Sequence, residues 1–393
     1  MNKAIINTEI QEFINKNLNS DVLALTLKGT NYFSVTTIEI IEQIEAKKRC
    51  EKKLPTWYNT QNIYYPNKLN VEQTSSEITA KYKSKIINGN TFIDLTGGFG
   101  VDSYYFSKQF NSVEHCEIDK NLSEIVKYNF KQLKIKNINA LNIDGIEHLT
   151  HSKSNYDLIY LDPSRRHESK GKVFFLKDCI PNVTTHLDLL FSRSKNIMIK
   201  TSPLLDLTIG IGELKYVKAI HVVAVNNEVK ELLWILENKF NGGIQIETVN
   251  LKKEKNDHFK FSLENEKNTQ SNYNLPLTYL YEPNSAILKS GGFDSISKEL
   301  KVFKLHKHSH LYTSDSLVDF PGRTFNIENI SPFNKKELKK LTNTKANITT
   351  RNFPESVQRI RKKFKIKDGG NSYMFFTTNM NSEKIMIKAS KVS

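Results

Sequence analysis

Hydrophobic and polar residues alternate with two different periods along this chain. Up to residue 53, apolar side chains recur every three or four positions, which predicts helices. The stretch from Asn70 to Ile87 has the same period, and Asn70 with Gln73 would form a capping box, so we predict one helix there. Between residues 91 and 250, short β-prone runs alternate with amphipathic stretches, which indicates a parallel sheet with helices between its strands.

The predicted strands and helices of this middle region follow one another regularly. We place strands at residues 91–95, 112–118, 138–143, 156–162, 196–201, 218–225 and 243–251. Helices are predicted near 101–109, 121–134, 181–192 and 229–238, with Pro181 at the first position of the third. Seven strands in this order predict a Rossmann-like, doubly wound α/β domain. The polar stretch 252–276 predicts a linker or an exposed hairpin, and two compact segments follow it.

The length and the cysteine content limit the class of protein. The chain has 393 residues, enough for two or three domains. Its three cysteines lie far apart, which favours a reducing compartment and argues against a disulfide framework. No apolar run approaches the roughly 18 residues of a membrane span, and the N-terminus lacks the apolar core of a signal peptide. We therefore expect a cytoplasmic protein without a membrane partner.

The formal net charge is +15, with a pI of about 9.4. A basic chain of this kind favours a polyanionic partner, most simply nucleic acid. A proteome rich in Lys, Asn and Ile raises the pI in the same way, so charge alone leaves both interpretations open. His306, His308 and His310 alternate along an extended segment, but no Cys or carboxylate completes a set of ligands nearby, and we expect no metal.

The run FIDLTGGFG at residues 92–100 is the most informative motif. An apolar strand leads into Gly97, Gly98 and Gly100, and a helical pattern follows, as at the start of a nucleotide-binding α/β domain. The spacing is not G-x-G-x-x-G, and no Lys-Ser/Thr pair follows the glycines. Asp94 instead lies at the strand end. A carboxylate there favours S-adenosylmethionine (SAM), which carries an amino group and a sulfonium but no phosphate.

Acidic residues also follow the next two predicted strands. Glu117 and Asp119 follow the second strand, where a carboxylate can accept both ribose hydroxyls; we favour Glu117 and keep Asp119 as the alternative. Asp144 follows the third strand, where a carboxylate can accept a hydrogen bond from the adenine amino group. Outside this context, Asp144-Gly145 would be an ordinary turn.

The fourth predicted strand ends in Asp162-Pro163-Ser164-Arg165-Arg166. Ligands of open α/β sheets bind beyond the carboxyl ends of the strands, so we expect Asp162 to face both the donor methyl group and the substrate. Pro163 stiffens the turn, and the two arginines suit a phosphate or a carboxylate. The alternative is that both arginines only solvate a loop.

Together the motifs DLTGGFGVD, CEID, NIDG and LDPSRR resemble those of class I SAM-dependent methyltransferases. The chain resembles, more narrowly, the bacterial members that carry a THUMP-like domain. LNVEQTSSEITAKYK (69–83) is similar to the helix that precedes the glycine turn in that family. LYEPNSAILKSGGF, HSHLYTSD and FPGRTF are similar to its ferredoxin-like segment, and ITTRNFPESVQRIRKKFKIKDGG (348–370) to its THUMP-like segment.

The resemblance covers nearly the whole chain and implies its organisation. It implies an N-terminal helical region (1–88), a methyltransferase domain with a seven-stranded sheet (89–252), a ferredoxin-like segment (277–330) and a basic THUMP-like segment (331–393), the last two forming a small α+β module. The implied catalytic residues are Asp162, Pro163, Ser164 and Arg165. The implied SAM-binding residues are Gln73, Ser76, Asp94, Thr96, Gly97, Gly98, Gly100, Glu117, Ile118, Asp144, Gly145 and Asp162. For Gln73 and Ser76 the alternative is helix capping and packing.

The acceptor is less well defined than the cofactor. Methylation of a pyrimidine at C5 needs a cysteine nucleophile near the fourth or fifth strand, and Cys179 is better explained as a core residue. Amino methyltransferases that act on bases commonly have D/N-P-P followed by an aromatic residue, which stacks on the flipped base. Ser164 and Arg165 replace that Pro-aromatic pair here, which weakens the case for methylation of a base amine.

Twelve Lys and Arg residues and only two Glu lie between residues 331 and 367. Such a stretch can neutralise phosphates, although charge runs are more commonly a solvated face. With the THUMP-like resemblance, we expect RNA binding by Arg166, Arg351, Arg359, Arg361, Lys362 and Lys363. The leading hypothesis is an RNA methyltransferase. The alternatives are a protein or small-molecule methyltransferase and a non-catalytic protein that binds SAM or RNA. The acceptor atom and the oligomeric state stay open.

Overall fold

The computed structural model describes residues 1–392 apart from 31, 33, 166–174, 335–336 and 338–343. The chain forms two compact units. The first contains Met1–Lys218 and Leu232–Asn241, and the second contains Ala219–Glu231 and Gly242–Ser393. Within the described residues no helix is long and apolar enough to cross a membrane.

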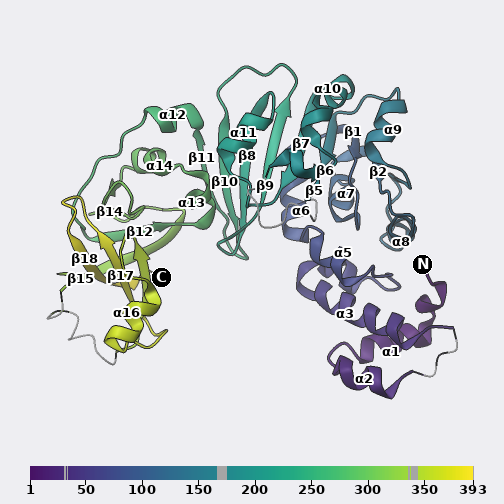
Figure 1. The fold of residues 1–393 in the computed structure, drawn as a ribbon, viewed down its shortest axis with the longest axis horizontal. Helices are drawn as coiled ribbons and strands as arrows, with labels where there is room; N and C mark the ends of the chain where they lie inside the picture. The colour runs from purple at the N-terminus through teal and green to yellow at the C-terminus, as the bar shows by residue number, and fades with distance from the viewer. Residues whose placement is uncertain (31, 33, 166–174, 335–336, 338–343, 393) are drawn as a thin grey trace. The chain divides into compact units, whose positions relative to one another are not determined.

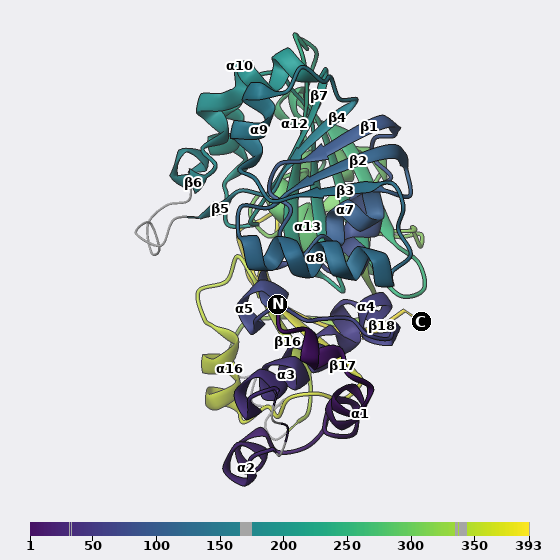
Figure 2. The same ribbon diagram turned by 90° about the vertical axis from the view of Figure 1, so that its right-hand side faces the viewer.

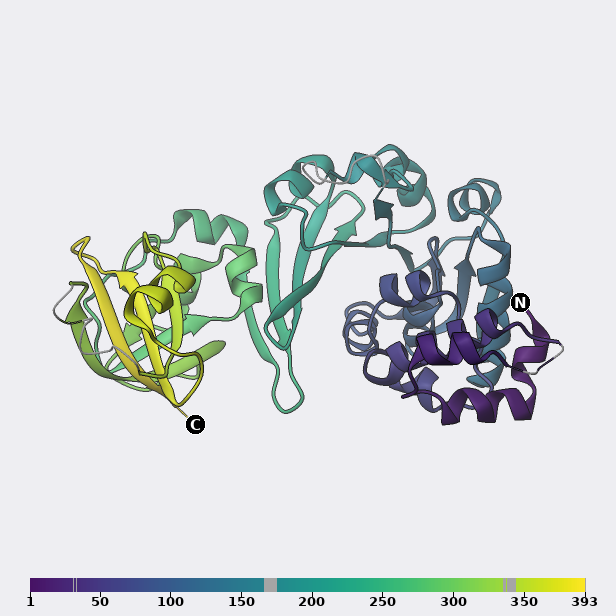
Figure 3. The same cartoon turned by 60° about the horizontal axis from the view of Figure 1, so that its bottom comes forward.

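Short helices pack together at the start of the first unit, as the apolar period predicts. They are η1 (Lys3–Ile6), α1 (Thr8–Lys16), α2 (Val22–Lys28), α3 (Thr37–Lys53) and α4 (Pro55–Asn59). Figure 3 shows the purple N-terminal helices lying together. Fully or almost fully buried aliphatic side chains of η1, α1 and α3 form one core, among them Ile5, Ile10, Ile14, Ile40 and Ile44.

The predicted single helix from Asn70 to Ile87 is wrong, because two helices occupy this stretch. They are α5 (Lys68–Gln73) and α6 (Glu77–Lys83). Asn67 caps α5, and Ser76 caps α6 by accepting a hydrogen bond from the Thr79 amide. Serine competes well for such amides, which favours a helix start over continuation through it. The chain between the helices is therefore extended at Thr74 and Ser76.

A large sheet follows the helices. Its strands are β1 (Gly89–Asp94), β2 (Phe110–Cys116), β3 (Ile138–Leu141), β4 (Leu158–Leu161), β7 (Asn196–Thr201), β8 (Val217–Val225), β9 (Glu228–Glu237), β10 (Gln245–Leu251) and β11 (Asp257–Ser262). The hydrogen-bonded order is β11-β10-β8-β9-β7-β4-β1-β2-β3. Strands β7, β4, β1, β2 and β3 are parallel, as predicted, and β9 is antiparallel to β7. Figure 2 shows β4, β1, β2 and β3 side by side.

The crossover helices of the first unit are α7 (Val101–Phe106), α8 (Lys120–Gln132), α9 (Gly145–His151), α10 (Val183–Arg193) and α11 (Leu207–Glu213). A small hairpin of β5 (Ser164–Arg165) and β6 (Cys179–Ile180) follows β4, and η3 (Leu176–Asp178) precedes β6. Helix α10 begins after its cap Asn182, so Pro181 lies outside the helix and not at its first position. The Rossmann-like α/β fold predicted from the alternation is confirmed (Figure 1).

The predicted helix at 229–238 is wrong, because this stretch is strand β9. Its residues Glu231 to Ile235 are all buried, so the strand has no polar face to give it a period of two. Periodicity cannot distinguish a short apolar run of this kind from a buried helix. Asn226 and Asn227, with φ of 49° and 66°, form the turn that precedes β9. An Asn pair between two apolar runs is a hairpin signal that favours the strand.

The second unit contains a seven-stranded sheet in the order β13-β14-β12-β15-β18-β17-β16. These strands are β12 (Tyr279–Pro283), β13 (Phe303–Lys304), β14 (Tyr312–Ser314), β15 (Gly322–Pro332), β16 (Asn347–Arg351), β17 (Ser372–Thr378) and β18 (Lys384–Lys391). Its helices are α12 (Leu263–Asn268), α13 (Ser285–Ser290), α14 (Phe293–Glu299) and α16 (Val357–Phe364). The stretch 252–276, predicted as a linker or an exposed hairpin, contains strand β11, which pairs antiparallel with β10 of the preceding segment, and helix α12.

Candidate methyl-donor and acceptor site

The parallel strands of the first unit bring the acidic residues to one edge. Strands β1, β2, β3 and β4 end just before Leu95, Glu117, Asn142 and Asp162 respectively. Because parallel neighbours end at the same edge, the loops that carry Asp94, Glu117, Asp144 and Asp162 follow one another along it. This edge is where an open α/β sheet binds its ligand.

The glycine turn between β1 and α7 has the conformation predicted for it. Gly98 and Gly100 have φ of 55° and 77°, a region that other residues adopt with strain. Gly97 is required for space, because a Cβ atom there would lie 2.1 Å from the ring of His115. The backbone can therefore approach a ligand closely at this turn.

Asp94 lies under the turn and is only 1% exposed. It accepts hydrogen bonds from the Thr96 amide (3.0 Å) and the Ser103 hydroxyl (2.7 Å). Burial raises the pKa of Asp94 to about 7, against the effect of these hydrogen bonds. Ser103 also lies 2.9 Å from Nδ1 of His115, and burial lowers the pKa of that histidine to about 3. Ser103 and His115 thus lie in one buried hydrogen-bonded group with Asp94, and the sequence did not single them out.

Glu117 joins the turn to the loop after β2. It accepts hydrogen bonds from the Gly98 amide at 2.9 Å and from the Asp119 amide at 2.7 Å. Burial is the main cause of its raised pKa. Asp119 has a different role, because its carboxylate caps α8 at the Leu122 amide (2.7 Å). Ile118 between them is 70% exposed, so its apolar side chain is accessible beside Glu117.

Asp144 and Gly145 begin helix α9. One oxygen of Asp144, Oδ1, accepts hydrogen bonds from the amides of Ile146 and Glu147. Gly145 is buried and packs against the backbone of Leu95 at the end of β1. The cap thus fixes Asp144 at the strand ends, with its second oxygen outside the cap.

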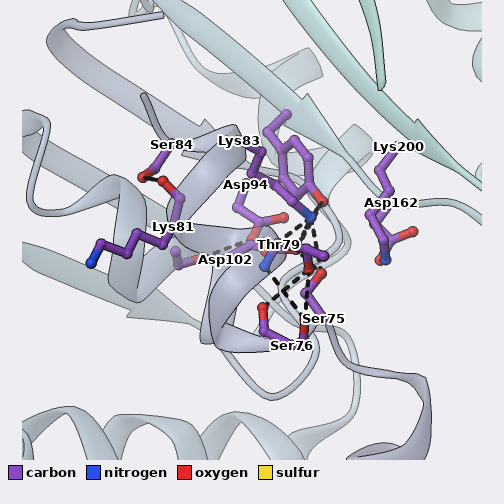
Figure 4. Close-up of polar contacts among 12 residues, drawn as sticks. Ser75, Ser76, Thr79, Lys81, Lys83, Ser84, Asp94, Asp102, Asp162 and Lys200 are labelled. Carbon is purple, nitrogen blue, oxygen red and sulfur yellow. Dashed lines mark hydrogen bonds and ion pairs between the residues drawn. The ribbon is translucent and has the colours of Figure 1, made fainter. Parts of the chain in front are cut away.

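Asp162 is ion-paired with Lys200 from the end of β7. The Asp162 amide donates to the Thr96 hydroxyl at 2.6 Å, which ties the loop to the glycine turn. Figure 4 shows the Asp162 and Lys200 side chains next to each other. The Asp162 side chain is 31% exposed and that of Lys200 is 13% exposed, so the pair is partly accessible to solvent. The sequence did not indicate Lys200 as a site residue, because a lone lysine in a sequence carries no signal of its partner.

The remaining predicted residues near Asp162 are less defined. Pro163 is buried, Ser164 is exposed, and Ser164 and Arg165 pair with β6 through their backbone. Arg166 lies outside the described residues. Gln73 is exposed at the end of α5, and the Ser76 hydroxyl caps α6.

A buried ion pair lies beside Ser76 and was missed in the sequence. Lys83 of α6 is 0% exposed, and its ammonium group lies 3.1 Å from Asp102 at the start of α7. Ser75 and Tyr160 bond to the same carboxylate, each at 2.8 Å. Burial would raise the pKa of Asp102, but Lys83, Lys200 and these hydrogen bonds hold it below its ordinary value.

A polar cavity of about 310 Å³ lies next to Asp119 in the first unit. It is formed by α3, the segment between α4 and α5, Asn70 of α5, and the start of α8. The lining residues are Glu42, Gln43, Tyr64, Tyr65, Pro66, Asn67, Asn70, Asp119, Asn121, Leu122 and Ile125. Within the described residues no cluster of His, Cys, Asp and Glu has the arrangement of a metal site.

The predicted RNA-binding cations of the second unit divide into two groups. Arg351 pairs with the buried Glu282 at 3.0 Å, and Arg361 bonds to the Ala346 carbonyl and pairs with Asp368. These two guanidinium groups therefore hold the local fold. Arg359, Lys362 and Lys363 of α16 are exposed, although Lys363 also pairs with Glu355 at 2.9 Å.

Three sequence families match separate parts of the chain. Residues 50–187 match a family described as conserved hypothetical protein 95. Residues 279–321 match a ferredoxin-like domain, and residues 322–391 match a family described as THUMP domain-like.

Two relatives are similar to parts or all of the chain. The crystal structure of a "putative methyltransferase" from Porphyromonas gingivalis is 32% identical over 100% of both chains, with a TM-score of 0.91. An uncharacterized RNA methyltransferase from Mycoplasma mobile is 35% identical over 86 residues. This second match spans 21% of the chain and 23% of the relative.

Proposed function

The chain belongs to the family of class I SAM-dependent methyltransferases with C-terminal ferredoxin-like and THUMP-like domains, and we propose that it methylates RNA. The observation that carries the proposal is the edge of the sheet, where the glycine turn, Glu117 and the Asp162–Lys200 pair come together. The family alone does not define the acceptor.

The residues at this edge fit SAM better than a phosphate-bearing cofactor. Carboxylates end the strands, and a carboxylate suits the amino and hydroxyl donors of SAM. Glu117, held by the Gly98 amide, would accept the ribose hydroxyls, and Asp144 would accept the adenine amino group. The exposed Ile118 would cover one face of the adenine ring. Asp94 is buried and would support the turn beside the methionine end.

When bound, SAM supplies an electrophilic methyl group on a positively charged sulfur. The protein's contribution is to position an acceptor in line with it and to exclude competing groups. Asp162, held by its ion pair with Lys200, would accept a hydrogen bond from the acceptor's N–H or O–H group. Thr96 fixes the loop that carries Asp162 relative to the turn.

The second unit supports RNA as the acceptor. Its C-terminal part matches the THUMP domain-like family, and α16 presents exposed cations. The Mycoplasma mobile relative, called an RNA methyltransferase, supports the same substrate class. A protein acceptor is the alternative, since the surface cations are no more than a general attraction for polyanions.

The class of acceptor can be identified by measuring which molecules of a cell extract receive the methyl group. The protein is incubated with radiolabelled SAM and total extract of a strain that lacks the gene, followed by RNase, DNase or protease. We expect RNase alone to remove the label. Label removed by protease would replace the RNA proposal with the protein acceptor. An Asp162→Ala variant, processed in parallel, should transfer no label.

A further inference from the structure

Hydrogen bonds to two charged side chains hold the turn between α5 and α6 in place. Ser75, in the middle of the turn, is only 6% exposed. Its hydroxyl donates to Asp102 at 2.8 Å and accepts from the Lys83 ammonium at 2.9 Å. A serine between two opposite charges is held from both sides, so the turn cannot shift without separating these bonds.

The same ion pair reaches two other parts of the site. Asp102 is the second residue of α7, directly after the glycine turn. Tyr160 lies in β4, two residues before Asp162, and its hydroxyl donates to Asp102 at 2.8 Å and accepts from Lys83 at 3.3 Å. Figure 4 shows Ser75, Lys83 and Asp102 converging on one another, with dashed lines between them. One carboxylate thus connects the α5–α6 turn, the start of α7 and the strand before Asp162.

Lys83 is unsuited to chemistry of its own. Its side chain is fully buried, and Ser75, Asp102 and Tyr160 accept from its ammonium group. A buried ion pair of this kind is weak evidence of stability, because the desolvation of both charges offsets their attraction. Its observed effect is geometric, since it fixes three segments that come from distant parts of the sequence.

We propose that Lys83 and Asp102 are positioning residues that hold the α5–α6 turn, through Ser75, over the methyl-donor end of the site. This inference rests on the proposed function for the identity of the donor. The turn carries Gln73 and Ser76 at its ends, so its placement would decide whether these two residues lie beside a bound cofactor. Neither Lys83 nor Asp102 touches the reacting atoms in this role.

Two serines of the same region make a matched pair for the test. Ser75→Ala removes the hydroxyl between the two charges. Ser84→Ala removes a hydroxyl that is equally buried, 2% exposed, but donates only to the nearby Lys81 carbonyl at 3.2 Å. Figure 4 shows Ser84 and Lys81 away from the ion pair. Ser75→Ala loses the two hydrogen bonds to the ion pair and frees the turn, whereas Ser84→Ala loses one local hydrogen bond and leaves the turn held.

The readouts are the affinity for S-adenosylhomocysteine by calorimetry and hydrogen exchange of residues 72–77 in the free protein. For Ser75→Ala we expect faster exchange in this segment and a rise in Kd on the order of tenfold, since a hydrogen bond to a charged group is lost. Ser84→Ala should leave both quantities unchanged. Equal exchange and equal Kd for the two variants would overturn the proposal.

The ion pair itself is tested with both charges removed together, because Lys83→Met alone leaves a buried carboxylate uncompensated and endangers folding. The double variant Lys83→Met/Asp102→Asn should fold and retain RNA affinity, yet show the exchange and Kd of Ser75→Ala. Exchange as slow as in the unsubstituted protein would contradict the assignment. Lys81→Met, on the exposed side of α6, is the matched lysine control.

Failure of this proposal is distinguishable from failure of the proposed function. If the unsubstituted protein binds neither SAM nor S-adenosylhomocysteine, the methyltransferase proposal and the positioning role both fall. If it binds them, but Ser75→Ala and Ser84→Ala have equal exchange rates and equal Kd values, the proposed function stands and the positioning role falls.

Discussion

Asp94 shows how a single residue can be predicted in place but not in environment. Its position at the end of β1 was evident from the motif, whereas its near-complete burial and its bonds to Thr96 and Ser103 come from the packing of α7 on the sheet. Burial raises its pKa to about 7, so the folded protein binds a proton there more tightly than the unfolded chain does.

Because of Asp94, the free energy of unfolding of the protein should therefore decrease as the pH rises. Between the ordinary pKa of 3.8 and about 7, the unfolded chain ionises Asp94 while the folded protein keeps it protonated. Asp94→Asn removes this pH dependence. As the pH rises, the free energy of unfolding of the variant should therefore increase relative to that of the unsubstituted protein, by about 1.4 kcal/mol per pH unit at most. Urea unfolding at pH 5 and pH 8 measures the difference. A difference between the two proteins that does not change with pH would contradict the raised pKa.

Glu117 and Asp119 are the two candidates for the carboxylate that binds the ribose hydroxyls, and variants of each distinguish them. Glu117 supports the glycine turn through the Gly98 amide, whereas Asp119 caps α8. Glu117→Ala should weaken SAM binding at least about tenfold, by loss of hydrogen bonds to a charged group. Asp119→Ala should lower the free energy of unfolding by about 1 kcal/mol, as for other caps, and leave the affinity unchanged. Calorimetric titration with thermal unfolding measures both, and the reverse pattern would assign the ribose to Asp119.

At the scale of elements, the correct predictions were those in which local signals agreed with the final packing. The strand, glycine turn and helix at residues 89–106 each have their own signal, and the structure contains all three. Strand β9 lacked one, because burial on both faces removed its period. The Asn226-Asn227 turn was the signal that would have corrected it.

A variant of helix α16 can test RNA docking without disturbing the local fold. Arg359→Gln, Lys362→Gln and Lys363→Gln together remove three exposed cations and leave the structural Arg361 in place. RNA affinity should fall, and the slope of log affinity against log salt should decrease by up to about 2, at roughly 0.7 per phosphate contact. Filter binding over a range of salt concentrations measures the slope.

The matched control removes three exposed lysines of the N-terminal helices, Lys16→Gln, Lys28→Gln and Lys52→Gln. Its net charge equals that of the α16 variant. If both variants lose RNA affinity equally, the attraction belongs to the net charge of the protein and α16 has no docking role.

For the whole molecule, catalysis and docking should fail separately. Asp162→Asn removes the negative charge that pairs with Lys200 but none of the exposed cations of the second unit. In steady-state methylation of RNA it should lower kcat by about 100-fold or more, within the usual range for a group acting on the acceptor's proton, with little change in KM for RNA. The α16 variant should raise KM and leave kcat nearly unchanged. Loss of RNA binding by Asp162→Asn would mean that the residue acts on folding or docking instead.

The sequence by itself determined the α/β class, the glycine turn and the order of acidic residues along the sheet edge, because these depend on neighbours close in the chain. It could not pair Lys200 with Asp162, which are 38 positions apart, or Lys83 with Asp102, which are 19 positions apart. Nor could it separate the exposed cations of α16 from Arg351 and Arg361, which hold carboxylates and carbonyls of other segments. Only the tertiary structure decides these, because the strength and role of a charge depend on its burial and on the partners that folding brings to it.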